Sequence, residues 1–489
     1  MESQNHPTHI DVLVVGAGLS GIAAGHYLRE RCPQRTFQIF EARERLGGTW
    51  DLFRYPGIRS DSDMYTLGYS FRPWEGEKAI ADGPDILQYL KDTVQAEGLE
   101  DKIHYNRKIV ASAWDSKERL WTVTVEDPRN GEQSKYTTSF LFMCSGYYDY
   151  EQGYTPNFPG REDYQGQFIH PQFWPEDLDY TGKDVVVIGS GATAITLLPN
   201  LAKHARKATM LQRSPTYVLS LPLKDKVAHS LKRYSPQLAH DLTRAKNIVG
   251  GLAVYQLSRK FPRTVKKLLM AETRRRAGNA VDVDTHFNPR YNPWEERLCV
   301  IPHGDLFKSI EAGKADVVTA HIERFTKDGI LLKDGRFLPA DIIISATGLN
   351  LSFLSGMGIT IDGEELQPEN ELAYKGLMLS NVPNMAHIFG YTNASWTLKA
   401  ELACKYICRV LNHMDKKGYE VVCAVNEDPS VKRLPLVDFS SGYFLRALDK
   451  MPGQGDRAPW RVHQNYFKDM VELRFKPLRG SGLQFVKNA

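Results

Sequence analysis

Two glycine-rich loops constrain the fold of this 489-residue chain more than any other feature. The first reads Gly16-Ala17-Gly18-Leu19-Ser20-Gly21, and the second reads Gly189-Ser190-Gly191-Ala192-Thr193-Ala194. Each loop follows a run of aliphatic residues, 11–15 and 184–188, of the kind found in central parallel strands. A strand that enters such a loop and continues as a helix forms the phosphate-binding turn of a dinucleotide fold. We therefore expect two doubly wound, Rossmann-like α/β domains, which pass electrons between two dinucleotides.

The first loop has the complete pattern of a dinucleotide site. Gly16 permits a tight turn, Gly18 lets the backbone approach a pyrophosphate, and Gly21 lets the following helix pack against the strand. The N-terminus of that helix offers free N–H groups to the phosphates. The next strand, 36–40, ends in Glu41, where a carboxylate can bind the ribose hydroxyls. Both NAD and FAD fit a site of this kind.

The second loop differs at the corresponding strand end. Its partner strand, about 208–211, ends in Gln212-Arg213-Ser214 rather than in an acid. A carboxylate repels a 2′-phosphate, whereas arginine binds one with a planar fork of donors. Ala194 in the third glycine position still allows close packing of helix and strand. The second nucleotide is therefore expected to be NADPH.

Further motifs resemble those of class B flavoprotein monooxygenases. After the first loop, Gly47-Gly48-Thr49-Trp50 continues through Tyr55-Pro56-Gly57 to Asp61. Between the loops, Tyr164-x-Gly166-x-x-x-His170-x-x-x-Trp174-Pro175 resembles the fingerprint of the Baeyer–Villiger branch, whose pattern opens with Phe instead of Tyr. The N-oxygenating sister branch usually ends this motif with Tyr or Phe, so Trp174-Pro175 favours the Baeyer–Villiger branch. Asp341-x-x-x-x-Ala346-Thr347-Gly348 is a second marker of the family.

The resemblance covers nearly the whole chain. Segments 49–65, 170–180 and 390–399 are similar to the mycobacterial ethionamide-activating monooxygenase subgroup. The similarity is looser in 224–288 and after Val425.

This resemblance implies FAD at the first loop and NADPH at the second. It places FAD against Gly16, Gly18, Ser20, Gly21, Glu41, Gly48, Thr49, Trp50, Asp51, Leu52, Arg59, Ser60, Asp61 and Ile109. It places NADPH against Gly189, Ser190, Gly191, Ala192, Thr193, Ala194, Arg213 and Ser214.

The resemblance also assigns the catalytic pair. Arg297 aligns with the catalytic arginine of the family, and Asp61 with the aspartate that holds its guanidinium. An arginine stays protonated and stabilises negative charge that develops on an attacked carbonyl oxygen. His170 is expected to orient the link between the domains rather than to transfer protons. Glu296 stands where some relatives use lysine to bind the 2′-phosphate, which leaves the strength of the NADPH preference open.

The leading prediction is an FAD-dependent, NADPH-consuming Baeyer–Villiger monooxygenase. It would insert one atom of O2 into ketones, giving esters or lactones, and would also oxidise sulfides and thioamide-type sulfur. Alternatives are an N- or S-oxygenating flavin monooxygenase without ketone activity, a flavin-dependent NADPH oxidase, and a non-catalytic nucleotide sensor. The physiological substrate, the regioselectivity and the oligomeric state stay open.

We expect both domains to be discontinuous. The FAD domain comprises 1–150 and 351–489, and the NADPH domain 151–219 and 296–350, with a helical insert at 220–295.

Composition excludes several other classes of protein. A net charge of +4 without a basic run gives no sign of a nucleic-acid partner, and the six cysteines form no Cys-x-x-Cys pair. No metal site is expected. Without a signal peptide or a long apolar run, a cytoplasmic protein is expected. The stretch Lys224–Arg276 mixes basic and apolar residues, which leaves peripheral membrane association open; a solvated helical subdomain is the favoured interpretation.

Overall fold

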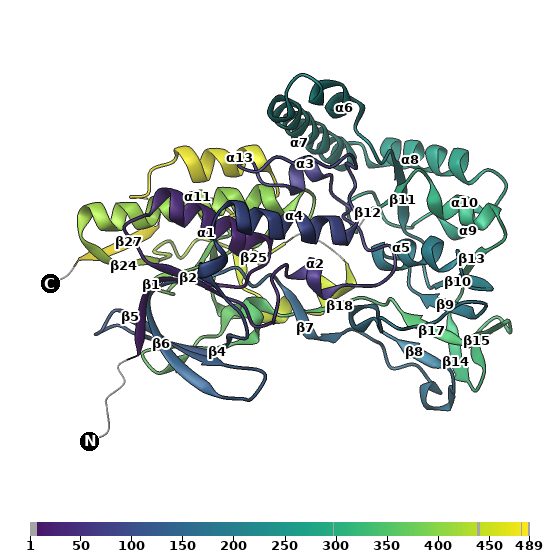
Figure 1. Ribbon diagram of the computed structural model, residues 1–489, viewed down its shortest axis with the longest axis horizontal. Helices are drawn as coiled ribbons and strands as arrows, with labels where there is room; N and C mark the ends of the chain where they lie inside the picture. The colour runs from purple at the N-terminus through teal and green to yellow at the C-terminus, as the bar shows by residue number, and fades with distance from the viewer. Residues whose placement is uncertain (1–6, 297, 438–440, 481, 488–489) are drawn as a thin grey trace.

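The computed structural model describes residues 7–296, 298–437, 441–480 and 482–487. Two large sheets, the first mixed and the second wholly parallel, lie side by side along an elongated molecule, and helices cover them (Figure 1). The predicted pair of Rossmann-like α/β units with a helical insert is confirmed.

The first sheet is built around a strand that is buried on both faces. Val12, Leu13 and Val14 of β1 are fully buried, as expected of a central parallel strand. The order of the sheet is β20-β19-β4-β5-β6-β1-β2-β3, with β23 paired to β6. The strands are β1 (Thr8–Val15), β2 (Phe37–Phe40), β3 (Ile103–His104), β4 (Lys108–Asp115), β5 (Leu120–Glu126), β6 (Gln133–Met143), β19 (Gly358–Ile361), β20 (Glu364–Glu365) and β23 (Met385–His387).

The last third of the chain returns to this first sheet. β23 lies parallel to the end of β6, and α11 (Trp396–Lys417) packs against α1 (Leu19–Arg31). Cys404 and Cys408, four residues apart, share the buried side of α11. Segments more than 350 residues apart in the sequence therefore form one core.

The second sheet is wholly parallel. Its order is β13-β10-β9-β17-β8, made of β8 (Gln167–Ile169), β9 (Asp184–Ile188), β10 (Lys207–Gln212), β13 (Ala315–Thr319) and β17 (Ile342–Ser345). Every residue of β9 is buried, and the strand enters the second glycine loop and then α5 (Ala192–Leu201). β9 thus corresponds to β1 of the first unit.

Two short strands carry the chain between the sheets. β7 (Tyr148–Gly153) leaves the first half, β18 (Leu349–Leu351) returns to it, and the two pair antiparallel. Both crossings therefore run side by side as a two-stranded ribbon at the centre of the molecule (Figure 1).

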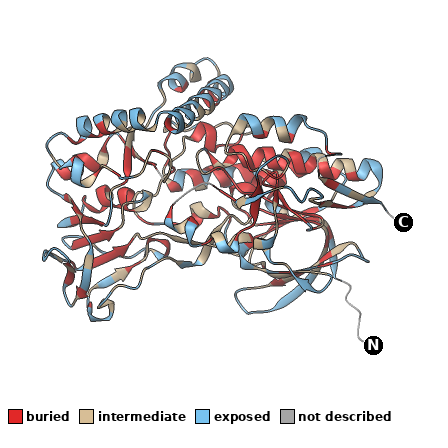
Figure 2. Cartoon of the chain, turned by 180° about the vertical axis from the view of Figure 1, so that it is seen from behind, coloured by how far each residue is buried: buried red, intermediate tan, exposed pale blue. Residues whose placement is uncertain are grey.

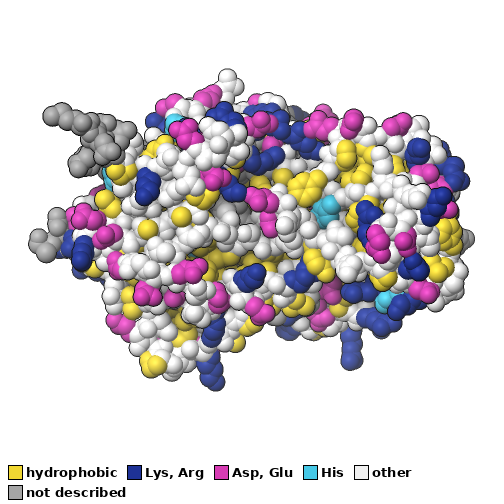
Figure 3. Space-filling model, turned by 90° about the horizontal axis from the view of Figure 1, so that it is seen from below, with side chains coloured by type: hydrophobic (Ala, Val, Ile, Leu, Met, Phe, Trp, Pro, Cys, Tyr) yellow, Lys and Arg dark blue, Asp and Glu magenta, His cyan; other side chains and the backbone are white. Residues whose placement is uncertain are grey.

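The segment between β11 (Tyr217–Leu221) and β12 (Leu298–Pro302) is helical. It contains α6 (Lys226–Lys232), α7 (Pro236–Lys260), α8 (Pro262–Ala277) and α9 (Val283–His286). Figure 2 shows that buried residues concentrate in the two sheets and their covering helices, whereas α6–α8 are largely exposed. On the face seen in Figure 3, acidic and basic side chains are interspersed.

Other short elements complete the part of the chain that the structure describes. The helices are α2 (Thr49–Leu52), α3 (Met64–Leu67), α4 (Gly83–Ala96), α10 (Asp305–Glu311), α12 (Gly442–Leu445) and α13 (Tyr466–Met470). The strands are β14 (Ile322–Thr326), β15 (Gly329–Leu332), β16 (Phe337–Pro339), β21 (Ala373–Tyr374), β22 (Met378–Leu379), β24 (Tyr419–Ala424), β25 (Arg433–Pro435), β26 (Gly453–Gly455) and β27 (Leu483–Lys487).

Candidate functional site

The first glycine loop leaves no room for side chains at two of its glycines. Gly16 has φ +100°, and a Cβ there would lie 2.9 Å from the carbonyl oxygen of Cys144. A Cβ on Gly21 would collide with the carbonyl oxygen of Gly16. Strand, turn and helix therefore approach as closely as the pattern predicts, which brings the N-terminus of α1 to the strand end.

The carboxylate of Glu41 is fixed in place at the end of β2. The residue is only 5% exposed, and its carboxylate accepts hydrogen bonds from the N–H of Ala17 (2.8 Å) and of Arg43 (3.0 Å). Burial raises the pKa of Glu41, and the two N–H donors oppose that shift. The carboxylate borders the same cavity as the glycine loop, which is the arrangement a ribose diol requires.

A second segment closes over this loop. The Cα of Gly48 lies 3.5 Å from the position of a Cβ on Gly18, and α2 follows directly. Asp51 of α2 is buried but does not line the cavity. Instead it pairs with Arg43 (2.8 Å), Arg45 (3.3 Å) and Arg54 (3.2 Å). Its geometry is that of a counter-ion for three arginines rather than of a direct cofactor contact.

The second glycine loop is more open. Gly189 has φ +135° and packs against the carbonyl of Ala346, but a Cβ on Gly191 would meet nothing within 4 Å. Ser190 Oγ donates to the carbonyl of Ser214 at 3.0 Å, which ties the loop to the end of β10. Arg213 and Ser214 are exposed. The space above Gly191 and the adjacent arginine suit a phosphate-bearing ligand.

Glu296 lies in the electrostatic field of Arg213. Both side chains line the cavity, burial raises the pKa of Glu296, and the charge of Arg213 lowers it. A carboxylate therefore stands where a second cation would strengthen binding of a 2′-phosphate.

One cavity of about 1550 Å³ borders both loops. This volume exceeds the roughly 300–1,000 Å³ of an ordinary small-ligand pocket, so the cavity has room for more than one ligand. The predicted residues that line it are Gly16, Gly18, Ser20, Glu41, Gly48, Thr49, Trp50, Leu52, Arg59, Ser60, Asp61, Ile109, Gly189, Ser190, Gly191, Ala192, Thr193, Arg213 and Ser214.

Four predicted residues are not among them. Gly21 and Ala194 pack within the two units, and Asp51 faces its arginines. Arg297 lies outside the described residues.

The segment 55–59 joins the two halves. The Tyr55 hydroxyl hydrogen-bonds to Thr193 of the second loop, and a Cβ on Gly57 would collide with Asn200 of α5. Arg59 pairs with Asp305 of α10 at 2.9 Å. The motif that follows the first loop thus also fixes the position of the second loop.

His170 is engaged on both ring nitrogens. The N–H of Gln172 donates to Nδ1 (3.2 Å), so Nε2 carries the proton and donates to the carbonyl of Gly348 (3.1 Å). Burial lowers the pKa of His170 and favours the neutral ring. Gln172 belongs to the linker and Gly348 directly precedes β18, so His170 connects the two crossings of the chain.

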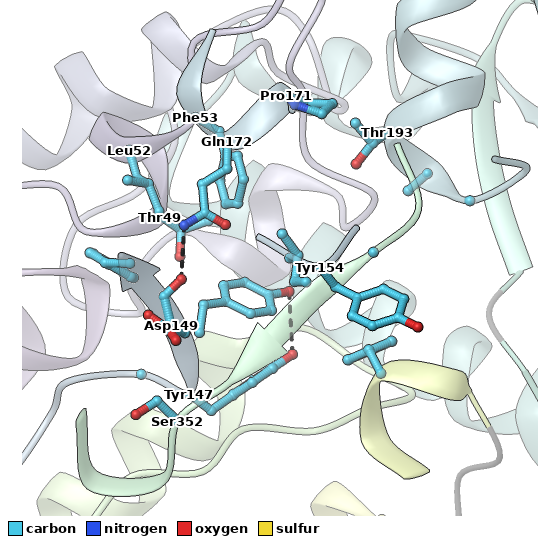
Figure 4. Close-up of a pocket in the computed structure, with 18 of the residues that line it drawn as sticks. Thr49, Leu52, Phe53, Tyr147, Asp149, Tyr154, Pro171, Gln172, Thr193 and Ser352 are labelled. Atoms are coloured by element: carbon cyan, nitrogen blue, oxygen red, sulfur yellow. Dashed lines mark hydrogen bonds between the residues drawn. The ribbon is translucent and has the colours of Figure 1, made fainter. Parts of the chain in front are cut away.

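Aromatic side chains from distant segments complete the cavity wall, and of these only Trp396 lies in a segment that the sequence analysis singled out. The ring of Tyr147 lies 5.2 Å from that of Trp396, and the guanidinium of Arg446 lies 3.4 Å from the ring of Tyr154. Figure 4 shows Tyr147 and Tyr154 beside the cavity, with Thr49 and Thr193 contributed by the two halves. Tyr443 lines the same wall. No local motif predicts that these rings meet, because tertiary packing alone brings them together.

Comparisons with known proteins agree with this geometry. Residues 80–367 match the family described as flavin-binding monooxygenase-like, and residues 14–75 match the NAD(P)-binding Rossmann-like domain. The chain is 54% identical to the FAD-containing monooxygenase EthA of Mycolicibacterium smegmatis, and 51% identical to EthA of Mycobacterium tuberculosis, over 98% of each protein. It is 49% identical to a probable FAD-binding monooxygenase, AlmA, of Acinetobacter, over 98% of this chain and 96% of AlmA.

Solved structures share the fold at lower identity. An oxidised steroid monooxygenase bound to NADP superimposes with a TM-score of 0.76 at 23% identity, over 98% of this chain and 100% of the other. An open cyclohexanone monooxygenase superimposes with a TM-score of 0.77 at 19% identity, over 98% and 99%.

Proposed function

Because the chain belongs to the flavin-binding monooxygenase-like family, we propose that it is a Baeyer–Villiger monooxygenase which also oxidises sulfur. The predictions of a flavin-dependent monooxygenase, and of FAD and NADP(H) as its cofactors, are confirmed by the family and by the relatives. The proposal adds the reaction type, the use of NADPH and the residues that carry them.

The observation that carries the proposal is the single cavity between the two glycine loops. A hydride donor and a hydride acceptor must lie in contact, and the two loops border the same cavity. When bound, the flavin supplies the redox and oxygen chemistry of the reaction. The chain supplies binding, orientation and charge.

For FAD, we assign the pyrophosphate to the loop at Gly16 and Gly18 and to the N-terminus of α1. The ribose hydroxyls are assigned to Glu41, whose carboxylate is fixed by two backbone donors. Gly48 and Thr49 close the loop from the opposite side. Tyr150, which hydrogen-bonds to Thr49, keeps this closing segment in place.

For NADPH, we assign the pyrophosphate to the loop around Gly191 and the 2′-phosphate to Arg213. The open space above Gly191 lets the backbone N–H groups reach the ligand. Arg213 is exposed, so a 2′-phosphate bound to it would lie beside solvent.

For oxygen transfer, we assign Arg297 as the residue that stabilises negative charge on the attacked substrate, with Asp61 as its orienting partner. Asp61 lines the cavity close to Tyr55 and Arg59. The cation would stabilise the tetrahedral oxyanion of a ketone, and a permanently protonated side chain suits that role.

For the substrate, we assign the aromatic wall formed by Tyr147, Tyr154, Trp396 and Tyr443. These rings favour flat, apolar or aromatic ligands through stacking and apolar burial. The names of the relatives specify a monooxygenase but no substrate. The assay must therefore include both ketones and sulfur-containing compounds.

The domain division proposed for this reaction follows the ribbon of β7 and β18. The FAD domain is 1–150 with 351–489, the NADPH domain is 151–219 with 296–350, and the helical insert is 220–295. Since both crossings lie in one ribbon, the two halves can shift about it between hydride transfer and oxygen transfer.

The test is aerobic incubation of the purified holoenzyme with NADPH and a panel of ketones, sulfides and thioamides, with products identified by mass spectrometry. We expect esters and sulfoxides that each gain one oxygen atom. Arg297→Ala is expected to consume NADPH slowly while forming no ester. Ester formation by Arg297→Ala at the wild-type rate would refute the assignment. Sulfoxide formation without any ester would support the oxygenase alternative, and hydrogen peroxide as the sole product would support the oxidase.

A further inference from the structure

The long helix α7 fully buries mostly polar residues and exposes an apolar stripe. Its buried residues are mostly polar, namely Ala239, His240, Thr243, Arg244 and Ser258. Its solvent side carries a stripe of Leu238, Leu242 and Val249, each about half exposed at 47%, 48% and 55%. A surface helix of a globular protein normally turns its apolar stripe toward the core.

The inward face of α7 is fixed by buried polar contacts. Arg244 donates to the carbonyl oxygens of Tyr65 (2.8 Å) and Gly68 (2.6 Å), and it pairs with the buried Glu401 of α11 at 2.6 Å. Rotating the helix to bury its leucines would break this network and leave Glu401 buried without its cation. The apolar stripe therefore points outward permanently.

Other exposed apolar side chains lie on the same side of the molecule. Ten of the seventeen exposed large hydrophobic residues described fall between Leu221 and Leu268. Three more lie on α13 and the π-helix that follows it (Val471–Phe475), which appear along the same edge as α6–α8 in Figures 1 and 2. The three are Phe467, Val471 and Phe475. We call α6, α7, α8, α13 and this π-helix the upper helical surface.

The upper helical surface is also strongly basic. Residues 224–276 contain fourteen Lys or Arg against three Asp or Glu, a net charge of +11 in a chain whose total is +4. The rest of the chain is therefore net acidic. Lys468 and Arg474 lie among the apolar residues of the C-terminal part of the surface, and Lys476 directly follows it.

We propose that the upper helical surface docks on an anionic lipid bilayer. An apolar stripe flanked by Lys and Arg is the pattern of a helix lying in the membrane interface, where its side chains enter the headgroup region and its cations meet lipid phosphates. No helix in the described ranges is long and apolar enough to cross a membrane. A second copy of the chain fits less well, because association through this surface would bring two such basic segments together.

The proposal is tested on the intact holoenzyme by co-sedimentation with vesicles of phosphatidylcholine containing phosphatidylglycerol, compared with phosphatidylcholine alone. Wild type is expected to bind the anionic vesicles and to be released as salt is added. The triple variant Leu238→Gln, Leu242→Gln and Val249→Gln is expected to bind roughly tenfold more weakly or worse, because it removes the apolar stripe but no charge.

A second variant tests the contribution of the basic side chains. Lys260→Gln, Arg263→Gln and Lys267→Gln together are expected to weaken binding roughly a hundredfold, since each cation near an anionic surface contributes independently. The matched control removes three exposed cations outside the upper helical surface. Lys314→Gln, Lys327→Gln and Lys333→Gln together should bind like wild type. Bound flavin and NADPH oxidation without vesicles verify that each variant is folded.

Three results would overturn the proposal. One is wild-type protein that stays in the supernatant with anionic vesicles at low salt. Another is equal binding by wild type and the apolar-stripe variant. The third is a wild-type protein that does not bind vesicles but forms a stable dimer, which the apolar-stripe variant abolishes. That result would assign the surface to self-association.

Discussion

The two glycine loops share a pattern but differ in how tightly they are enclosed. The first is covered by Gly48, backed by Cys144 and completed by Glu41, which is 5% exposed. The second has open space above Gly191 and ends in the exposed Arg213. Under the proposed assignment, the enclosed loop would hold the flavin and the open loop the coenzyme.

The largest expected difference is between Gly21→Ala in the first loop and Gly191→Ala in the second, each of which adds one methyl group. In Gly21→Ala the added Cβ would collide with the carbonyl oxygen of Gly16, so strand and helix cannot keep their close approach. We expect loss of bound FAD and of most soluble protein. In Gly191→Ala nothing lies within 4 Å, so the fold and the flavin content should be retained, with weaker NADPH binding.

Flavin content per chain and thermal unfolding measure this difference. The natural Ala194, which occupies the third position of the second loop, is the internal control. If Gly21→Ala keeps its flavin as well as Gly191→Ala does, the enclosure of the first loop is not what holds the flavin.

The next largest effect is expected at Glu41. Glu41→Gln keeps the size of the side chain but removes the negative charge that we assign to the ribose hydroxyls. A hydrogen bond to a charged group contributes roughly 1.5–3 kcal/mol, so the dissociation constant of FAD should rise roughly ten- to a hundredfold. Equilibrium dialysis or flavin fluorescence after dilution gives this constant, and an unchanged value would remove Glu41 from the site.

A smaller and selective effect is expected at the open loop. Arg213→Gln should raise the KM for NADPH roughly tenfold and leave the KM for NADH nearly unchanged, because only NADPH carries the 2′-phosphate that the guanidinium binds. Steady-state oxidation of both coenzymes provides the comparison. Equal changes for both would place the phosphate contact elsewhere.

The smallest effect is expected at Glu296. Because its carboxylate lies in the field of Arg213, Glu296→Gln should improve the KM for NADPH by roughly two- to fivefold and leave that for NADH unchanged. Glu296→Asp retains the charge and serves as the control. An improvement in both variants, or in neither, would separate Glu296 from the phosphate site.

The sequence predicted what depends on local order along the chain. The strands before both loops, Glu41 and Arg213 at the partner-strand ends, and the helical segment 220–295 could all be inferred, because each follows from periodicity or fixed spacing. The resemblance to class B flavoprotein monooxygenases, now confirmed, supplied the chemistry.

What could not be predicted depends on tertiary contacts. Asp51 belongs to a matching motif, but three arginines from neighbouring turns draw its carboxylate away from the cavity. Tyr147 and Trp396 meet only because α11 packs back on α1. The polar buried face of α7 is visible only once Arg244 is seen to be buried against Glu401.

The most direct test of the contrast between the two loops is anaerobic rapid mixing of the desalted enzyme with NADPH or NADH, following the visible absorbance of the flavin. We predict that the enzyme retains FAD through desalting, that NADPH bleaches it at lower concentration than NADH, and that Arg213→Gln abolishes this difference without loss of FAD. A flavin lost on desalting, or reduced equally well by both coenzymes in the wild type, would contradict the assignment of an enclosed flavin loop and an open NADPH loop.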